Sequence, residues 1–248
     1  MAIQLRSRTD AAGNPGSFYD ASTFETTDEF HPVRMFEDFV GPGHVVPAAG
    51  SAVPGYAWVA KIVDTSGAPT VAVVSNGSAG VMAATLDATS EKQDAAIYAG
   101  DVLNWNATEG LVFEARIAMH VLPSAAAVQM VWGVSSAWID GPNNRTYYLE
   151  FEALASGLVN VRKKDGVATT SVSSGVTLVA DAYHVFRIAV DSTPTATFYI
   201  DGANVGTAAW GATSGNSVLQ PYMSAYKASG TGVGTLYVDR VMLAMNRS

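Results

Sequence analysis

LVFEARIAMHV, residues 111–121, alternates apolar side chains with polar or small ones from Phe113 to its end. Every odd-numbered position is apolar or alanine, whereas charged residues such as Glu114 and Arg116 occupy even-numbered positions. Successive side chains of a strand point to opposite faces of a sheet, so this pattern predicts one long β-strand with one buried face. Residues 183–191 repeat the alternation and predict a second such strand.

Further short strands are predicted along the rest of the chain, separated by turn residues. They cover residues 56–63, 70–75, 80–86, 95–99, 128–134, 146–153, 158–163, 195–201, 203–208, 218–226 and 234–245. Asp165-Gly166 and Asp201-Gly202 lie between neighbouring strands, and this dipeptide favours a tight hairpin turn because both turn residues need positive φ. No helix of three turns is expected, and residues 87–94 are expected to form one short helical turn at most.

The fold class that follows is all-β, a two-sheet antiparallel β-sandwich with a core between two curved sheets. We expect this core to be filled by Phe113, Phe186, Phe198 and Ile200.

The first 35 residues differ from the rest in composition. They are rich in Gly, Asn, Pro, Ser, Thr and Asp, and they cannot bury enough apolar surface to form a core of their own. Four aromatic residues are nevertheless spaced along them: Phe18, Tyr19, Phe24 and Phe30. We therefore expect two parts, an extended N-terminal arm over residues 1–35 that docks on a partner through these rings, and a β-sandwich domain over residues 36–248.

Composition excludes several classes of protein. The chain has 248 residues, 15% of them charged, a net charge of -8 and no cysteine. Disulfides and thiolate metal sites are therefore absent, and an acidic surface disfavours nucleic acid. The one basic run, residues 162–164, is predicted to be the polar tip of a hairpin. Neither a secretory signal nor an apolar run long enough to span a bilayer is found, so we expect a soluble chain with no membrane partner.

Three blocks of sequence carry a resemblance to a known family. They are residues 87–121, residues 177–202 and residues 219–239, the last reading LQPYMSAYKASGTGVGTLYVD. Together they resemble the concanavalin A-like (laminin G-like) jelly rolls that tailed bacteriophages encode as virion structural proteins, over about residues 36 to 245.

This resemblance implies a non-enzymatic capsid decoration (cement) protein on the virion head surface, assembled in the host cytoplasm. The partners it implies are the major capsid protein and neighbouring copies of the chain. We expect the copies to form a homo-oligomer, most simply a trimer. Because one fold hosts many functions, the resemblance is more specific for the fold than for the role.

Two carboxylate pairs are the candidates for glycoside hydrolysis, Glu150 with Glu152 and Glu37 with Asp38. Glycan hydrolases of this fold carry three acidic residues on one strand, because an acid and a nucleophile must flank one glycosidic bond. Glu150 and Glu152 share a strand face, but residues 153–155 contain no third carboxylate. We therefore expect a solvated strand face here, and no catalytic residues. The four histidines lack zinc-ligand spacing.

The second functional hypothesis is a carbohydrate-binding (lectin-like) module, or a fibre or tail domain that attaches to host glycans. Trp138, Asp140, Asn143 and Asn144 combine a flat ring with polar groups that can bind sugar hydroxyls. No cofactor is expected, with one alternative. Lectin-like sandwiches hold Ca²⁺ through loop oxygens, and residues 140–144 are the loop that would hold it here.

Overall fold

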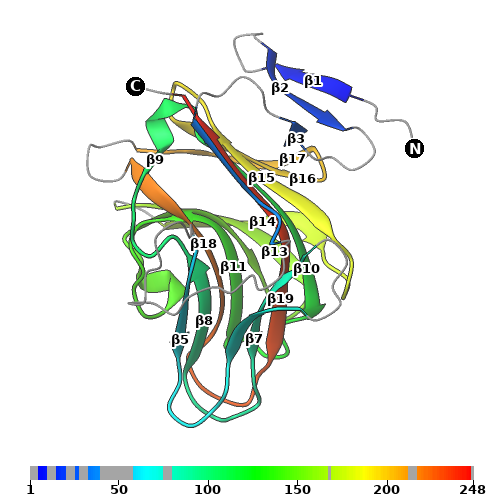
Figure 1. Ribbon diagram of the computed structural model, residues 1–248, viewed down its shortest axis with the longest axis vertical. Helices are drawn as coiled ribbons and strands as arrows, with labels where there is room; N and C mark the ends of the chain where they lie inside the picture. The colour runs from blue at the N-terminus through cyan, green and yellow to red at the C-terminus, as the bar shows by residue number, and fades with distance from the viewer. Residues whose placement is uncertain are drawn as a thin grey trace.

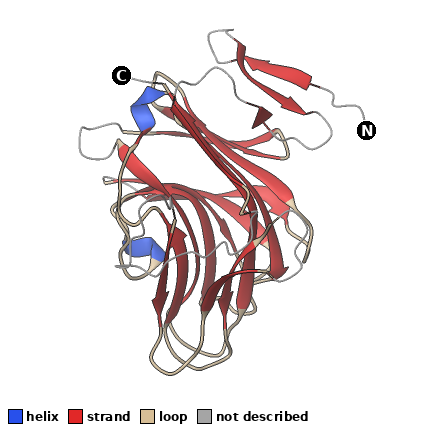
Figure 2. Ribbon diagram, viewed as in Figure 1, coloured by secondary structure: helices blue, strands red, loops and turns tan. Residues whose placement is uncertain are grey.

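The computed structural model describes residues 33–39, 58–74, 80–166, 169–211 and 217–246 in full, together with the backbone of strands at residues 5–9, 15–20 and 26–27. Nearly all regular structure is β-strand (Figure 2). The helical elements in the described part of the chain are two short 3₁₀ turns, η1 (Ala107–Glu109) and η2 (Pro142–Asn144). None of the described segments forms a helix with the length and apolarity needed to cross a membrane.

Two antiparallel sheets face each other, which confirms the predicted sandwich (Figure 1). Sheet I has the order β17 (Ala203–Ala209), β16 (Thr195–Ile200), β15 (His184–Val190), β10 (Val112–Val121), β19 (Gly234–Met245), β7 (Met82–Leu86), β6 (Thr70–Val73), with β4 (Val33–Glu37) also paired to β19. Sheet II has the order β14 (Thr169–Thr177), β13 (Leu158–Asp165), β12 (Tyr147–Ala153), β11 (Val128–Ser135), β18 (Val218–Lys227), β8 (Gln93–Tyr98), β5 (Val59–Val63), with β9 (Trp105–Asn106) also paired to β18.

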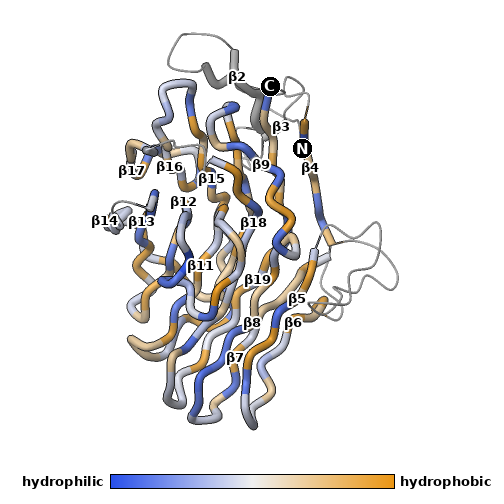
Figure 3. The backbone as a smooth tube through the Cα atoms, turned by 90° about the vertical axis from the view of Figure 1, so that its left-hand side faces the viewer, coloured by the Kyte–Doolittle hydropathy of each residue, from blue (hydrophilic) through white to orange (hydrophobic). Residues whose placement is uncertain are grey.

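The core lies between the sheets and is built by the alternation seen in the sequence. Apolar and polar residues follow one another along the strands (Figure 3). Trp132 of sheet II meets Phe186 of sheet I with ring centroids 4.7 Å apart, and Phe151 of sheet II meets Phe198 of sheet I at 5.4 Å. The four residues expected in the core are all buried: Phe113, Phe186, Phe198 and Ile200.

The last strand, β19, occupies the middle of sheet I. It pairs with β10 on one side and with β7 and then β4 on the other. Because β4 spans residues 33–37 and belongs to the sandwich, it crosses the boundary expected between residues 35 and 36.

The Asp201-Gly202 hairpin turn is confirmed, whereas in the β13–β14 hairpin Asp165 is the last residue of β13 and lacks the positive φ predicted for it. Asp201 and Gly202 have φ of 49° and 79° between β16 and β17, as the tight turn requires. Gly166 has φ of 82° between β13 and β14, and a Cβ there would lie 2.6 Å from the Tyr147 ring.

The N-terminal strands β1 (Leu5–Thr9), β2 (Pro15–Asp20) and β3 (Thr26–Thr27) form a small antiparallel sheet of their own. The side chains of the arm aromatics Phe18, Tyr19, Phe24 and Phe30 lie outside the described residues. The docking role expected for them stays a prediction.

Residues 87–94, for which one short helical turn at most was expected, form no helix. Asp87 instead accepts a hydrogen bond from the Thr89 amide at 2.7 Å, and Glu91 accepts one from the Gly67 amide at 2.8 Å. Side chains that bond backbone amides in this way stabilise non-helical backbone, so the segment stays within the predicted limit of one short turn.

Candidate functional site

The outer face of sheet II, which points away from the core, carries an unusual set of polar side chains. Its strands place Glu150 and Glu152 of β12, Arg162 of β13 and Asp94 of β8 on this one face. All four are nevertheless buried. A second layer of protein must therefore cover the face.

The β11–β12 connection, residues 136–146, provides this cover through Arg145, whose side chain is fully buried. The Arg145 guanidinium binds the Glu150 carboxylate, lies 4.0 Å from the Tyr222 ring centroid, and donates from Nε to the Pro142 carbonyl at 3.0 Å. A buried cation needs a counter-charge and hydrogen bonds to offset its lost hydration, and these partners supply both.

Glu150 and Glu152 share a face, as predicted, but they are not solvated, so that part of the expectation is wrong. Arg162 Nη1 lies 3.3 Å from Glu150 Oε1 and 2.9 Å from Glu152 Oε1. Burial raises the pKa of Glu152, and the Glu150 charge adds to this, while Arg162 opposes it. The prediction for residues 162–164 is also wrong, because Arg162 lies within β13 and is buried.

Glu150 and Glu152 are thus bound by arginine side chains that hold the fold together. A glycosidase needs two carboxyl groups that reach opposite sides of one bond. Glu150 is 1% exposed, and the residue two positions earlier on the same face, Tyr148, is not a carboxylate. The other predicted pair lies on the opposite sheet, where Glu37 accepts a hydrogen bond from the Phe39 amide at 2.8 Å.

The predicted glycan residues are brought to one loop, but they do not converge on one point. Trp138 packs over an apolar cluster that includes Tyr98 and Tyr222, and Lys61 Nζ lies 4.9 Å from its ring centroid. Its Nε1 donates to Asp94 at 3.1 Å. The other four tryptophans are buried in the main core: Trp58, Trp105, Trp132 and Trp210.

The polar members of the predicted set already bind one another or nearby side chains. Asp140 pairs with Lys92, and Asn144 donates to the Asp140 carbonyl at 2.7 Å. Asn143 accepts from Arg162. Within the described ranges no group of three or more metal-ligating side chains occurs.

Asp94 is the most perturbed carboxyl on this face. Ser224 Oγ donates to it at 2.6 Å from the neighbouring strand, in addition to the Trp138 bond. Burial, the largest influence, raises the Asp94 pKa to about 6, against the hydrogen bonds that favour the charged form.

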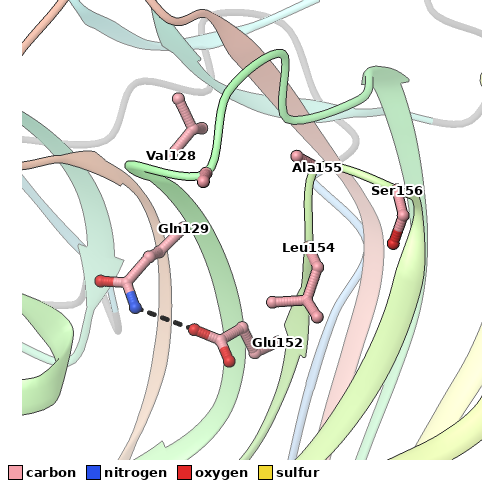
Figure 4. A pocket seen from close by; sticks show the side chains of 7 residues that line it. Val128, Gln129, Glu152, Leu154, Ala155 and Ser156 are labelled. Carbon is pink, nitrogen blue, oxygen red and sulfur yellow. Dashed lines mark hydrogen bonds between the residues drawn. The ribbon is translucent and has the colours of Figure 1, made fainter.

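A pocket of about 300 Å³ opens where β11 begins and β12 ends (Figure 4). Its lining residues are Ala126, Val128, Gln129, Glu152, Leu154, Ala155 and Ser156. Gln129 Nε2 donates to Glu152 Oε1 at 2.9 Å, and Asn143 of the loop lies 3.5 Å from Gln129 Oε1.

The sequence offered only a weak signal for this pocket. Gln129 and Glu152 are polar residues at outward positions of two predicted strands, but their proximity depends on the pairing of β11 with β12. Leu154 and Ala155 of the apolar wall lie in the turn after β12, where the sequence shows no strand alternation.

The sandwich resembles solved structures of carbohydrate-active proteins. An immunostimulatory antigen and pseudo β-1,3-glucanase of Mycobacterium tuberculosis matches with a TM-score of 0.58 and 16% identity, covering 86% of this chain and 98% of that one. An endo-1,3-β-glucanase of Streptomyces sioyaensis matches with a TM-score of 0.58 and 15% identity, covering 86% of this chain and 96% of that one. The Emp47p carbohydrate recognition domain matches with a TM-score of 0.53 and 8% identity, covering 82% of this chain and 95% of that one.

These matches show that the chain has the concanavalin A-like lectin/glucanase fold. No family model and no curated protein matches the sequence. At identities this low, the structural matches establish the fold and leave the function to be argued from the site.

Proposed function

We propose that this chain is a non-hydrolytic carbohydrate-binding module whose binding site is the pocket between the start of β11 and the end of β12. The observation that carries the proposal is the pocket's composition. An amide and a carboxylate, Gln129 and Glu152, are held in fixed orientation beside a wall of Val128, Leu154 and Ala155. Ligand sites commonly combine an apolar wall with a few oriented polar groups, and sugars offer hydroxyls and C–H faces to both.

Two further facts support binding without hydrolysis. The named structural neighbours include a carbohydrate recognition domain and a pseudo-glucanase as well as a glucanase. Glu150 is covered by Arg145 and shared with Arg162, so it cannot approach a glycosidic bond unless the loop over residues 136–146 moves away.

A bulky residue placed in the pocket tests this proposal. Ala155 lines the pocket and is exposed, so Ala155→Trp fills the space without disturbing the core. On a glycan array, we expect the wild-type chain to bind a defined set of sugars and Ala155→Trp to lose at least 10-fold in affinity. The matched control is Ala203→Trp, at an exposed position on β17, which should bind as the wild type does. An array without signal for the wild type, or equal binding by both variants, would overturn the proposal.

A second proposal, a capsid decoration protein, is favoured by one observation. Strands β1, β2 and β3 pair with one another and contribute no strand to either sandwich sheet, as an element reserved for a partner would. The partners under this proposal are the major capsid protein and neighbouring copies, at the virion head. Replacing the four aromatics of the segment by serine in the full chain should abolish capsid binding and leave the melting temperature unchanged. Retained binding would contradict it.

A further inference from the structure

The polar side of the pocket carries no surplus charge. Glu152 Oε1 accepts hydrogen bonds from Gln129 Nε2 and Arg162 Nη1, each at 2.9 Å (Figure 4). Arg162 pairs with this carboxylate, and the buried Arg145–Glu150 pair beside it is balanced as well. The pocket therefore recognises a ligand through the direction of its hydrogen bonds and through its shape.

Two hydrogen-bonding positions on this side remain open to a ligand. Gln129 Nε2 has a second hydrogen besides the one it donates to Glu152, and no described residue accepts it. Glu152 Oε2 accepts from no described residue either, and the buried polar atoms without a partner do not include it, so it is exposed in the pocket. One donor and one acceptor thus lie side by side. Two hydroxyls on neighbouring carbons match this pair, since one hydroxyl can accept while the other donates.

The rest of the pocket is mostly apolar. Leu154 lies directly after β12, and Ala126 and Ala155 extend the same wall. Ser156 is the other polar side chain of the lining, but it is exposed, and its Oγ already accepts from the Leu158 amide at 3.3 Å. A ligand hydroxyl placed against this wall loses its bonds to water without replacing them, whereas a methyl group gains from burial.

We infer, building on the proposed function, that the pocket binds a terminal 6-deoxyhexose, a sugar that carries a methyl group where common hexoses carry a hydroxymethyl group. A volume of about 300 Å³ is at the lower end of the range for ligand sites and holds one ring. With O3 and O4 of the sugar on Gln129 and Glu152, the methyl group on the next carbon, C5, packs against Leu154. The anomeric carbon, opposite C4 in the ring, points outward to the rest of the glycan.

The test compares sugars that differ only in the hydroxyl on C6. They are the methyl α-glycosides of L-fucose against L-galactose and of L-rhamnose against L-mannose, titrated by calorimetry at pH 7 with the full chain. In the better-bound pair we expect the 6-deoxy sugar to bind about 10-fold more tightly, because the extra hydroxyl of its partner is left without a hydrogen bond.

A second measurement also needs no variant. Methylation of O4 removes one of the two hydroxyls that the polar pair binds and adds bulk beside Glu152. The 4-O-methyl ether of the preferred 6-deoxy glycoside should therefore bind the wild-type chain roughly 10-fold more weakly, or not at all.

Two variants separate the roles of the apolar wall and the polar pair. Leu154→Asn gives the extra hydroxyl a partner, so the preference should fall below about 3-fold. Gln129→Leu removes the donor, so both sugars should bind roughly 10-fold more weakly while their ratio stays the same. The matched control is Leu103→Asn, at an exposed position outside the pocket, which should change neither the affinities nor the ratio.

The outcomes distinguish the two proposals. If no sugar binds, or if Ala155→Trp binds as the wild type does, the proposed function fails. If sugars bind in the pocket but the 6-hydroxyl sugar binds as tightly as its 6-deoxy partner, only the present inference fails. A preference that Leu154→Asn leaves unchanged, or binding that survives methylation of O4, would also overturn it. If Leu154→Asn does not fold, the two wild-type measurements decide.

Discussion

Both sheets bury charged residues on their outer faces, Glu114 with Arg240 on sheet I and Glu150 with Arg145 on sheet II, but the region around Arg116 and His120 of sheet I stays open to water. On sheet I, Arg116 pairs with Asp239 at 2.5 Å beside solvent, and His120 stacks on Tyr237 with centroids 4.6 Å apart. His120 is exposed, and Phe36 of β4 is 59% exposed. On sheet II, Arg145 and Glu150 are shielded from water almost completely.

The difference comes from one connection. The loop over residues 136–146 turns the outer face of sheet II into a second, polar interior, whereas Arg116 on sheet I keeps about a third of its side chain exposed. Charged groups that look alike in sequence therefore contribute differently to stability. An ion pair in water adds little, but a buried ion that loses its partner is strongly unfavourable.

The largest expected effect compares Arg145→Ala with Arg116→Ala. Removing Arg145 leaves the buried Glu150 without its counter-charge, and we expect the free energy of unfolding to fall by about 3–5 kcal/mol. Removing Arg116 breaks a partly exposed pair and should cost about 1 kcal/mol or less. Urea denaturation of both variants measures the difference.

A double variant sharpens this comparison. Replacing both Arg145 and Glu150 by methionine removes the whole pair, so we expect it to be more stable than Arg145→Ala alone. Equal losses for Arg145→Ala and Arg116→Ala would show that the loop does not shield the face.

The next effect concerns Asp94, whose pKa is raised to about 6 by burial from an ordinary value of 3.8. Between these values the folded state keeps a proton that the unfolded state has lost, so stability falls as pH rises from about 4 to about 6. The full loss is about 3 kcal/mol. The free energy of unfolding of the wild type relative to Asp94→Asn should therefore decline over this range and level off above it. A flat difference would mean that Asp94 is ionised normally.

The smallest expected changes in stability come from removing one aromatic ring from the outer face of each sheet. Trp138 is half-buried on the sheet II cluster, so Trp138→Ala should destabilise the chain by about 2 kcal/mol, less than a fully buried tryptophan would. His120→Ala, at an exposed position on sheet I, should change stability by about 0.5 kcal/mol or less. Thermal unfolding distinguishes the two, and a larger effect at His120 would reverse the comparison.

Much of the fold could be predicted because its signals are local. Alternation along residues 111–121 and 183–191 depends only on which side chains face the core, and Asp201-Gly202 encodes its own turn. The conformation of residues 87–94 depends instead on contacts that are distant in sequence. Glu91 there binds the backbone of Gly67, 24 residues earlier, a partner that local pattern cannot indicate.

The candidate site shows the same division. The sequence placed Glu150 and Glu152 on one face, since two residues apart on a strand means the same side. It could not show that they are buried, because that depends on where the loop with Arg145 lies. Nor could it show the pocket, whose polar pair Gln129 and Glu152 meets only through strand pairing.

By itself, the sequence determined that this chain is an all-β sandwich, because strand periodicity and hairpin turns are properties of neighbouring residues. Only the tertiary structure decided which of its polar residues remain in water. Burial of a charge depends on which segment of the folded chain packs above it, and on sheet II that segment is the β11–β12 loop, whose position the strand pattern does not give.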